Sequence, residues 1–185
     1  MTDIQTEDAW RTPQIVRDRM AVRDGHPERI VALGRDVCLA LLIYKLHNEL
    51  YEIEAEPSSA EEVADFLTAL QAVYDIVSPA WSSADAGFNR HDTSVMPLPA
   101  FIVSMAMTSD DVRISGYGAI HGLIQGFARN LLDRAAYARF VKQVSLCAKA
   151  SGVDPQGVVE RYMDKNKRHG GFDAHILRID TRFPG

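Results

Sequence analysis

The chain reads KLHNELYEI over residues 45–53 and EEVADFL over residues 61–67. In and around both stretches, apolar residues recur three or four positions apart, which is the spacing of one face of an α-helix. We therefore predict one helix from about Arg35 to Glu54 and a second from about Ala60 to Val77. The connection between them is short, so the two helices should lie side by side in antiparallel orientation.

The rest of the chain also favours helices, because sustained alternation of apolar and polar residues is scarce. A short helix is expected to begin at Thr12-Pro13. Later helices are predicted over residues 117–133, 134–150 and 154–170, with 100–107 either helical or extended. The sequence thus predicts one all-α domain over residues 1–185, an antiparallel helical bundle with extra C-terminal helices. Its parts are a core at 22–77, a long loop at 78–99, C-terminal helices at 100–170 and a tail at 171–185 that crosses another subunit or lies on the surface.

The composition is that of a soluble globular protein, with 46% hydrophobic and 24% charged residues. A net charge of −5 argues against a protein that coats nucleic acid, which would carry a basic surplus. The chain contains no run of about 18 apolar residues, and its N-terminus lacks a signal-peptide pattern. Cys38 and Cys147 have neither metal-ligand nor redox spacing, so we expect reduced thiols. We predict a cytoplasmic protein with no membrane partner.

Four acidic residues stand in two pairs, one on each of the first two predicted helices: Glu49 and Glu52, then Glu62 and Asp65. The members of each pair are three positions apart, so they are neighbours on the helix surface. Both pairs are rotated from their apolar stripes by similar angles in the same sense. An antiparallel hairpin would therefore bring all four carboxylates to the same edge. Oxygen ligands in this number suit Mg²⁺ or Mn²⁺.

Two simpler roles for these acidic residues compete with a metal site. Glutamate is a strong helix former, and most glutamates on helices simply face solvent. A helix-capping box is also available, formed either by Ser58 with Glu61 or by Ser59 with Glu62. Choosing Ser58 with Glu61 leaves Glu62 free to bind a metal, and the matched positions of the two acidic pairs favour the metal site.

The two stretches at 45–53 and 61–67 resemble the core motif of the MazG-like, all-α nucleoside triphosphate pyrophosphohydrolase superfamily, whose pattern is K-L-x-E-E-x-x-E-L followed by E-E-L-A-D-V-L. That superfamily includes dimeric dUTPases and phosphoribosyl-ATP pyrophosphohydrolases. The resemblance implies that a nucleoside triphosphate, in particular a deoxynucleotide such as dGTP or dUTP, is hydrolysed to the monophosphate and pyrophosphate. It also implies two or more Mg²⁺ ions per site and a homodimer or homotetramer. Asn48 departs from the pattern, because many members carry a further glutamate there.

A group of basic and amide side chains marks the end of the last predicted helix. Arg161, Lys165 and Arg168 share one face at spacings of four and three, and Asn166 lies beside them. The surrounding segment resembles one that family members use near the triphosphate, so these four residues and Lys45 are predicted to bind the substrate phosphates. The alternative role is a local one, because basic residues at a helix C-terminus complement the helix dipole.

The family resemblance implies that a metal-activated water attacks the substrate, and Glu49 and Glu52 are the candidates that polarise this water. No residue can be assigned to the nucleobase, although Trp81 and Phe88 in the predicted loop are candidates for stacking on it. Three glycines recur every four residues and predict close helix packing, within the chain or across a subunit boundary: Gly118, Gly122 and Gly126.

Two alternative functions remain open. His91-Asp92 is the dipeptide of HD-type phosphohydrolases, which are also helical and metal-dependent but release inorganic phosphate or triphosphate. The dipeptide stands in the predicted loop, away from the helices on which such a site would need further ligands. The second alternative is a catalytically inactive helical module that keeps the scaffold for interactions alone.

Overall fold

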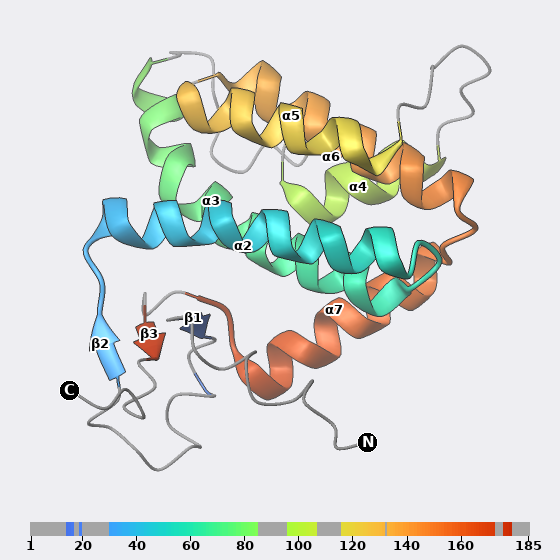
Figure 1. Ribbon diagram of the computed structural model, residues 1–185, viewed down its shortest axis with the longest axis horizontal. Coiled ribbons are helices and arrows are strands. Elements are labelled where there is room, and N and C mark those ends of the chain that lie inside the picture. The colour runs from blue at the N-terminus through green and yellow to red at the C-terminus, as the bar shows by residue number, and fades with distance from the viewer. Residues whose placement is uncertain are drawn as a thin grey trace, which may run out of the picture.

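The computed structural model describes residues 14–16, 19, 30–84, 96–106, 116–131, 133–172 and 176–178. The described part is mostly helical, which confirms the helical class predicted from the sequence (Figure 1). Its helices are α2 (Arg35–Ala55), α3 (Ala60–Ala84), α4 (Pro97–Ala106), α5 (Tyr117–Arg129), α6 (Arg134–Ala150) and α7 (Pro155–His169). None of the helices in these ranges is long and apolar enough to span a membrane.

Helices α2 and α3 form the predicted antiparallel hairpin. The Arg35 guanidinium at the start of α2 donates a hydrogen bond of 2.8 Å to the Ile76 carbonyl, far along α3. The facing stripes of both helices are fully buried, with Leu42, Leu46 and Leu50 on α2 and Phe66 and Leu67 among those on α3. The apolar spacing that predicted the two helices therefore also forms their interface.

The remaining helices cover the hairpin from two sides. Helix α5 packs on α2 and α6, α4 packs on α6 and α3, and α7 lies along α3. In Figure 1 the hairpin is accordingly the middle layer, with α4, α5 and α6 on one side and α7 on the other. This arrangement brings α7, which begins more than 70 positions after the hairpin ends, against the hairpin.

Helix α3 continues beyond its predicted end at Val77, so the predicted loop at 78–99 is wrong at its start. The helix passes through Pro79 and ends at Ala84. Proline removes one backbone hydrogen bond and usually breaks a helix. Here the buried stripe continues to Trp81, which is 2% exposed and whose indole N–H donates to the Leu131 carbonyl at 2.7 Å. Tertiary packing thus outweighs the local preference.

Proline acts in the opposite way at α4. This helix begins at Pro97, with Pro99 still in its first turn, where a missing backbone N–H costs nothing. Residues 100–106 are therefore helical, which decides between the two alternatives left open by the sequence. The predicted start of α7 is also confirmed, because Asp154 caps the helix by accepting from the backbone N–H groups of Gln156 and Gly157. Gly170 then ends it with a φ of +74°.

A small sheet joins segments near the two ends of the chain, which the sequence did not predict. Its strands are β1 (Gln14–Val16), β2 (Ile30–Ala32) and β3 (Ile176–Arg178). Strand β3 lies in the centre and pairs antiparallel with both others, so that Leu177 is opposite Ile15 on one side and Val31 on the other. The helix expected from Thr12-Pro13 is wrong at residues 14–16. Strands of three residues are too short to show an alternating pattern.

Trp81 should be a major contributor to the stability of this fold. Its ring lies 5.2 Å from that of Tyr137 and 6.4 Å from that of Phe127, within a fully packed aromatic cluster. Trp81→Ala should lower the free energy of unfolding by about 3–5 kcal/mol, because it leaves a cavity and removes the donor to Leu131. Urea denaturation followed by circular dichroism measures the loss.

Tyr137→Phe is the matched control for this measurement. The Tyr137 hydroxyl is buried and has no hydrogen-bond partner in the described part of the chain. Removing it should change the free energy of unfolding by less than about 1 kcal/mol or raise it. Equal losses in the two variants would contradict the importance assigned to Trp81.

Candidate metal site

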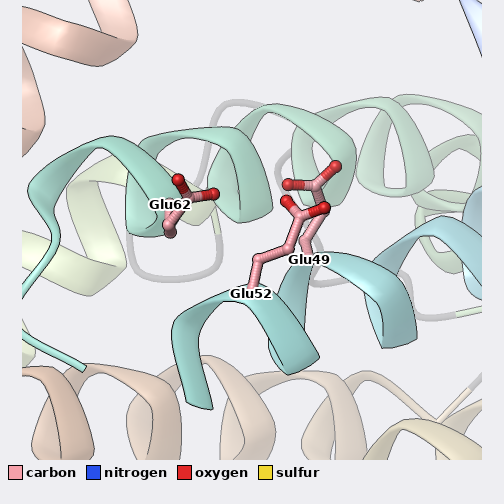
Figure 2. Close-up of side chains that lie close together, drawn as sticks. All are labelled: Glu49, Glu52 and Glu62. Carbon is pink, nitrogen blue, oxygen red and sulfur yellow. The ribbon is translucent and has the colours of Figure 1, made fainter. Parts of the chain in front are cut away.

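Three of the four predicted metal ligands meet between α2 and α3. Glu49, Glu52 and Glu62 each offer a carboxylate oxygen, and these oxygens all lie within 4.8 Å of one another. Figure 2 shows Glu49 and Glu52 on adjacent turns of α2, with Glu62 on α3. Leu50 and Val63, the chain neighbours of Glu49 and Glu62, are fully buried, so the acidic side chains lie at the edge of the core.

Glu49 is the most deeply placed of the three, with only 4% of the residue exposed. Lys45, one turn earlier on α2, donates a hydrogen bond to its Oε1 atom. Its Oε2 atom is buried and has no hydrogen-bond partner among the described residues. A buried carboxylate oxygen without a partner is costly. This unsatisfied oxygen and the two further carboxylates within reach of it are suited to binding a cation. The unsatisfied oxygen distinguishes the site from acidic residues that merely lie close together on a surface.

Repulsion within the cluster changes the protonation of its members. Partial burial of its carboxyl group, followed by the negative charges of Glu49 and Glu62, raises the pKa of Glu52 to about 7. Burial also raises the pKa of Glu62 from its usual range. A hydrogen bond between these two side chains stabilises the proton on Glu52 and the charge on Glu62. Without a metal and below about pH 7, the cluster therefore holds a proton in place of a cation.

Asp65, the fourth predicted ligand, has a different partner. Lys165 of α7 donates to Asp65 Oδ2 at 2.5 Å and lies 2.9 Å from Glu61 Oε1. Although burial alone lowers the pKa of Lys165, its hydrogen bonds to Asp65 and Glu61 outweigh that effect and raise it. The same ammonium lowers the pKa of Glu61. Asp65 thus lies beside the three-glutamate cluster, but its charge is already neutralised.

The predicted phosphate-binding residues divide into two groups. Lys45 contacts Glu49 within the cluster, and Lys165 contacts Asp65 beside it. Arg168 instead pairs with Asp164 on its own helix at 2.8 Å and is largely exposed, and Arg161 is exposed as well. Asn166 is partly buried, and its backbone carbonyl accepts from Gly170 at the end of α7.

The capping assignment made from the sequence needs correction. Ser59, not Ser58, caps α3, because its Oγ accepts from the backbone N–H of Glu62 at 3.3 Å. The chosen partner, Glu61, is bound to Lys165 instead. The side chain of Glu62 is nevertheless directed to Glu52, so the cap takes only its backbone and leaves its carboxylate in the cluster.

The assignment of Trp81 to nucleobase stacking is also corrected. Its indole is buried in the aromatic core, so it has no face left for a base. Phe88 and the His91-Asp92 dipeptide lie outside the described residues. The glycine stripe of α5 packs within the described chain only at Gly118, where an added Cβ would lie 3.9 Å from Glu54; at Gly122 and Gly126 an added Cβ would have no atom within 4 Å.

Two histidines form a contact that the sequence did not indicate. His47 of α2 and His121 of α5 approach to 2.6 Å between their Nδ1 atoms. Their rings are nearly parallel, but their centroids are 4.9 Å apart. The rings therefore meet edge to edge through these nitrogens and are not stacked face to face. No local pattern could have predicted a pair separated by 74 positions in sequence.

Comparison with known proteins adds no relative, since no family model, no curated protein and no solved structure matches this chain.

The acidic cluster predicts an unusual pH dependence of stability in the absence of metal. Because Glu52 binds its proton more tightly in the folded than in the unfolded chain, its contribution is present at low pH and is lost as the pH rises through about 7. Glu52→Gln should therefore stabilise the metal-free protein near pH 8 by about 1 kcal/mol, after allowing for solvent screening of this exposed residue, or roughly 2–4 °C in Tm.

Calorimetry in the presence of a chelator measures this difference. Well below pH 4.5, the ordinary pKa of a glutamate, the Tm values of Glu52→Gln and the parent chain should converge, because both side chains are then neutral in the folded and in the unfolded chain. Glu56→Gln, an exposed glutamate at the end of the same helix, is the control. A variant that is equally stabilised at both pH values would show that repulsion in the cluster is not the cause.

The cluster should also bind divalent cations in the absence of substrate. At a Mg²⁺ or Mn²⁺ concentration 100 times Kd, binding stabilises the fold by about 2.7 kcal/mol, which corresponds to roughly 5–10 °C in Tm. Calorimetry near pH 8 measures the shift, and Glu62→Gln should abolish most of it while Glu56→Gln retains it. If neither Mg²⁺ nor Mn²⁺ changed the Tm of the parent chain, the proposed metal site would be wrong. The same would follow if the ions shifted the Tm of Glu62→Gln and of Glu56→Gln equally.

Proposed function

We propose that this protein is a Mg²⁺-dependent nucleoside triphosphate pyrophosphohydrolase, which converts a nucleoside triphosphate and water to the monophosphate and pyrophosphate. The observation that carries the proposal is the buried, unpartnered Oε2 atom of Glu49, placed within reach of Glu52 and Glu62. The resemblance of the two acidic motifs to the pyrophosphohydrolase superfamily supplies the reaction. The geometry supports it because carboxylates from two helices at one point are suited to Mg²⁺ coordination.

Glu49, Glu52 and Glu62 would hold the cation, and Asp65 would join them once Lys165 releases it. Mn²⁺ can replace Mg²⁺ in such an oxygen-rich site, and the resemblance implies two or more ions. When bound, the metal supplies charge neutralisation for the phosphates and a more acidic water. Of the two candidates for polarising that water, Glu52 is the more accessible, because Glu49 is buried and already accepts a hydrogen bond from Lys45.

Lys45 and Lys165 would bind the substrate phosphates. Lys45 already neutralises Glu49, and Lys165 already neutralises Asp65. A cation that takes over these two carboxylates would therefore leave both ammonium groups available for another anion. A triphosphate arriving with Mg²⁺ brings such an anion to the same place. The lysines then stabilise the negative charge that develops on the departing pyrophosphate. Arg161, Asn166 and Arg168 extend this basic end of α7 toward solvent.

The identity of the nucleotide is a further part of the proposal. We favour a deoxynucleotide such as dGTP or dUTP, in a cytoplasmic homodimer or homotetramer that controls the nucleotide pool. The choice of nucleotide and the role in the nucleotide pool depend on the family resemblance alone. An HD-type phosphohydrolase and an inactive helical module are retained as alternatives that the following experiment separates.

A panel of ribo- and deoxynucleoside triphosphates, incubated with the protein and Mg²⁺, tests the proposal. At least one of them should yield the monophosphate and pyrophosphate, resolved by ion-exchange chromatography. Glu49→Gln and Glu62→Gln should each lower kcat/KM by about 10²–10³-fold or more, because each removes a ligand charge from the metal. Lys165→Met should lower it by about 10-fold or more through loss of phosphate binding.

Controls and products distinguish the alternatives. Glu56→Gln should retain full activity, and helical circular dichroism should be unchanged in every variant. Release of triphosphate or inorganic phosphate would indicate an HD-type reaction instead. If metal binds but no triphosphate in the panel is hydrolysed, the inactive module is the better description.

A further inference from the structure

One face of α2 carries exposed apolar side chains in a regular line. The large apolar residues that are exposed in the described part of the chain are Val37, Tyr44, Tyr51, Val103 and Met163. Three of these lie on α2, seven residues apart, and each is 55–60% exposed. Seven residues make nearly two helical turns, so the three side chains share one side of the helix. Scattered apolar residues are ordinary on a surface, but a line of them on one helix is not.

A second row completes the pattern. Leu41, Asn48 and Ala55 follow Val37, Tyr44 and Tyr51 at intervals of four, and they again repeat every seven residues. Leu41 is partly buried, whereas Asn48 and Ala55 are exposed. We call these six residues the α2 seam; none of them carries a charge. Two uncharged rows with a heptad repeat are the pattern with which one helix packs along another, and a single polar asparagine in such a seam fixes its register.

The α2 seam continues onto α5. The Tyr51 ring lies 4.4 Å from that of His121, and a Cβ on Gly118 would be 3.9 Å from Glu54. Beyond them Gly122 and Gly126 are exposed, and an added Cβ at either would have no atom of the described chain within 4 Å. In Figure 1, α2 lies in front of α3 and α5 in front of α6, so the two helices form the near face of the molecule. Because glycine has no side chain, nothing protrudes from α5 at these two positions, and another helix could approach its backbone closely.

Charge determines what fits the seam. The C-terminal end of α2 carries Glu54 and Glu56 outside the acidic cluster, and no basic residue lies in its last turn. The N-terminal end carries Arg35 together with the positive end of the helix dipole, with Asp36 as the acidic residue of the first turn. A second α2 in antiparallel orientation would place the acidic end of each helix beside the positive end of the other. A parallel copy would place like charges together.

We propose that two copies of this chain associate through the α2 seam, with the two α2 helices antiparallel across a two-fold axis. The axis would pass near Tyr44 and Asn48, which stand in the middle of the seam. A two-fold axis brings each such residue close to its own copy. Asn48 suits that position, because a side-chain amide both donates and accepts and can therefore pair with an identical amide. The association does not depend on the proposed enzymatic function, and its test needs neither metal nor nucleotide.

Sedimentation equilibrium of the full chain in the presence of a chelator tests the proposal. The parent chain should have twice the 20.5 kDa of a single chain at micromolar concentration. Tyr44→Glu should raise the Kd of the dimer by about 100-fold or more, because it places two like charges at the axis. Met163→Glu, at a residue that is 61% exposed on α7, is the matched control and should leave the dimer intact. Val37→Glu gives a second variant, toward the end of the seam.

Cross-linking tests the antiparallel arrangement. Chains carrying Val37→Cys, mixed with chains carrying Ala55→Cys, should form a mixed disulfide dimer under mild oxidation much faster than either variant does alone. A parent chain that sediments as a monomer would overturn the proposal. So would a Tyr44→Glu dimer as tight as that of Met163→Glu, since the copies would then meet elsewhere. Faster cross-linking within each single variant than in the mixture would overturn the antiparallel orientation.

Discussion

A carboxylate that is taken out of water needs a counter-charge or a hydrogen-bond donor for each of its oxygens. Where α2 meets α3, Glu49 lies beside the buried Leu50 at the edge of the core, with only one of its oxygens satisfied. Glu52 and Glu62 add two more acidic groups at the same point. The hairpin can be packed well only if this excess of negative charge is balanced, and much of the surrounding structure serves that balance.

The chain supplies three partial solutions in the absence of metal. Lys45 neutralises one oxygen of Glu49, Lys165 holds Asp65, and below about pH 7 a proton resides on Glu52. A divalent metal ion could replace each of these positive groups, that is, the two lysine ammonium groups and the proton. The proposal of a metal-dependent enzyme follows from this exchange, because the two displaced ammonium groups remain at the edge of the site and are suited to binding phosphate.

The other helices determine where these charges lie. Helix α7 is held along α3, and its Lys165 therefore reaches the hairpin from the side opposite to the layer of α4, α5 and α6. The aromatic cluster around Trp81 of α3 and Tyr137 of α6 joins the layer of α4, α5 and α6 to the C-terminal end of α3. Since the core and the acidic cluster take up two faces of α2, its uncharged seam is the face that remains for a second copy.

The sequence by itself determined the hairpin and its acidic residues, because helical periodicity is local: a spacing of three puts Glu49 beside Glu52, and a short connection makes α2 and α3 antiparallel. It likewise determined the start of α7, where Asp154 and Pro155 act on neighbouring backbone groups. Only the tertiary structure decided that Lys165 takes Asp65 out of the cluster, that Trp81 is a core residue, and that β3 pairs with β1 and β2. Those contacts join residues 50 to about 160 positions apart, where packing and charge across the whole fold act and no local pattern records the partner.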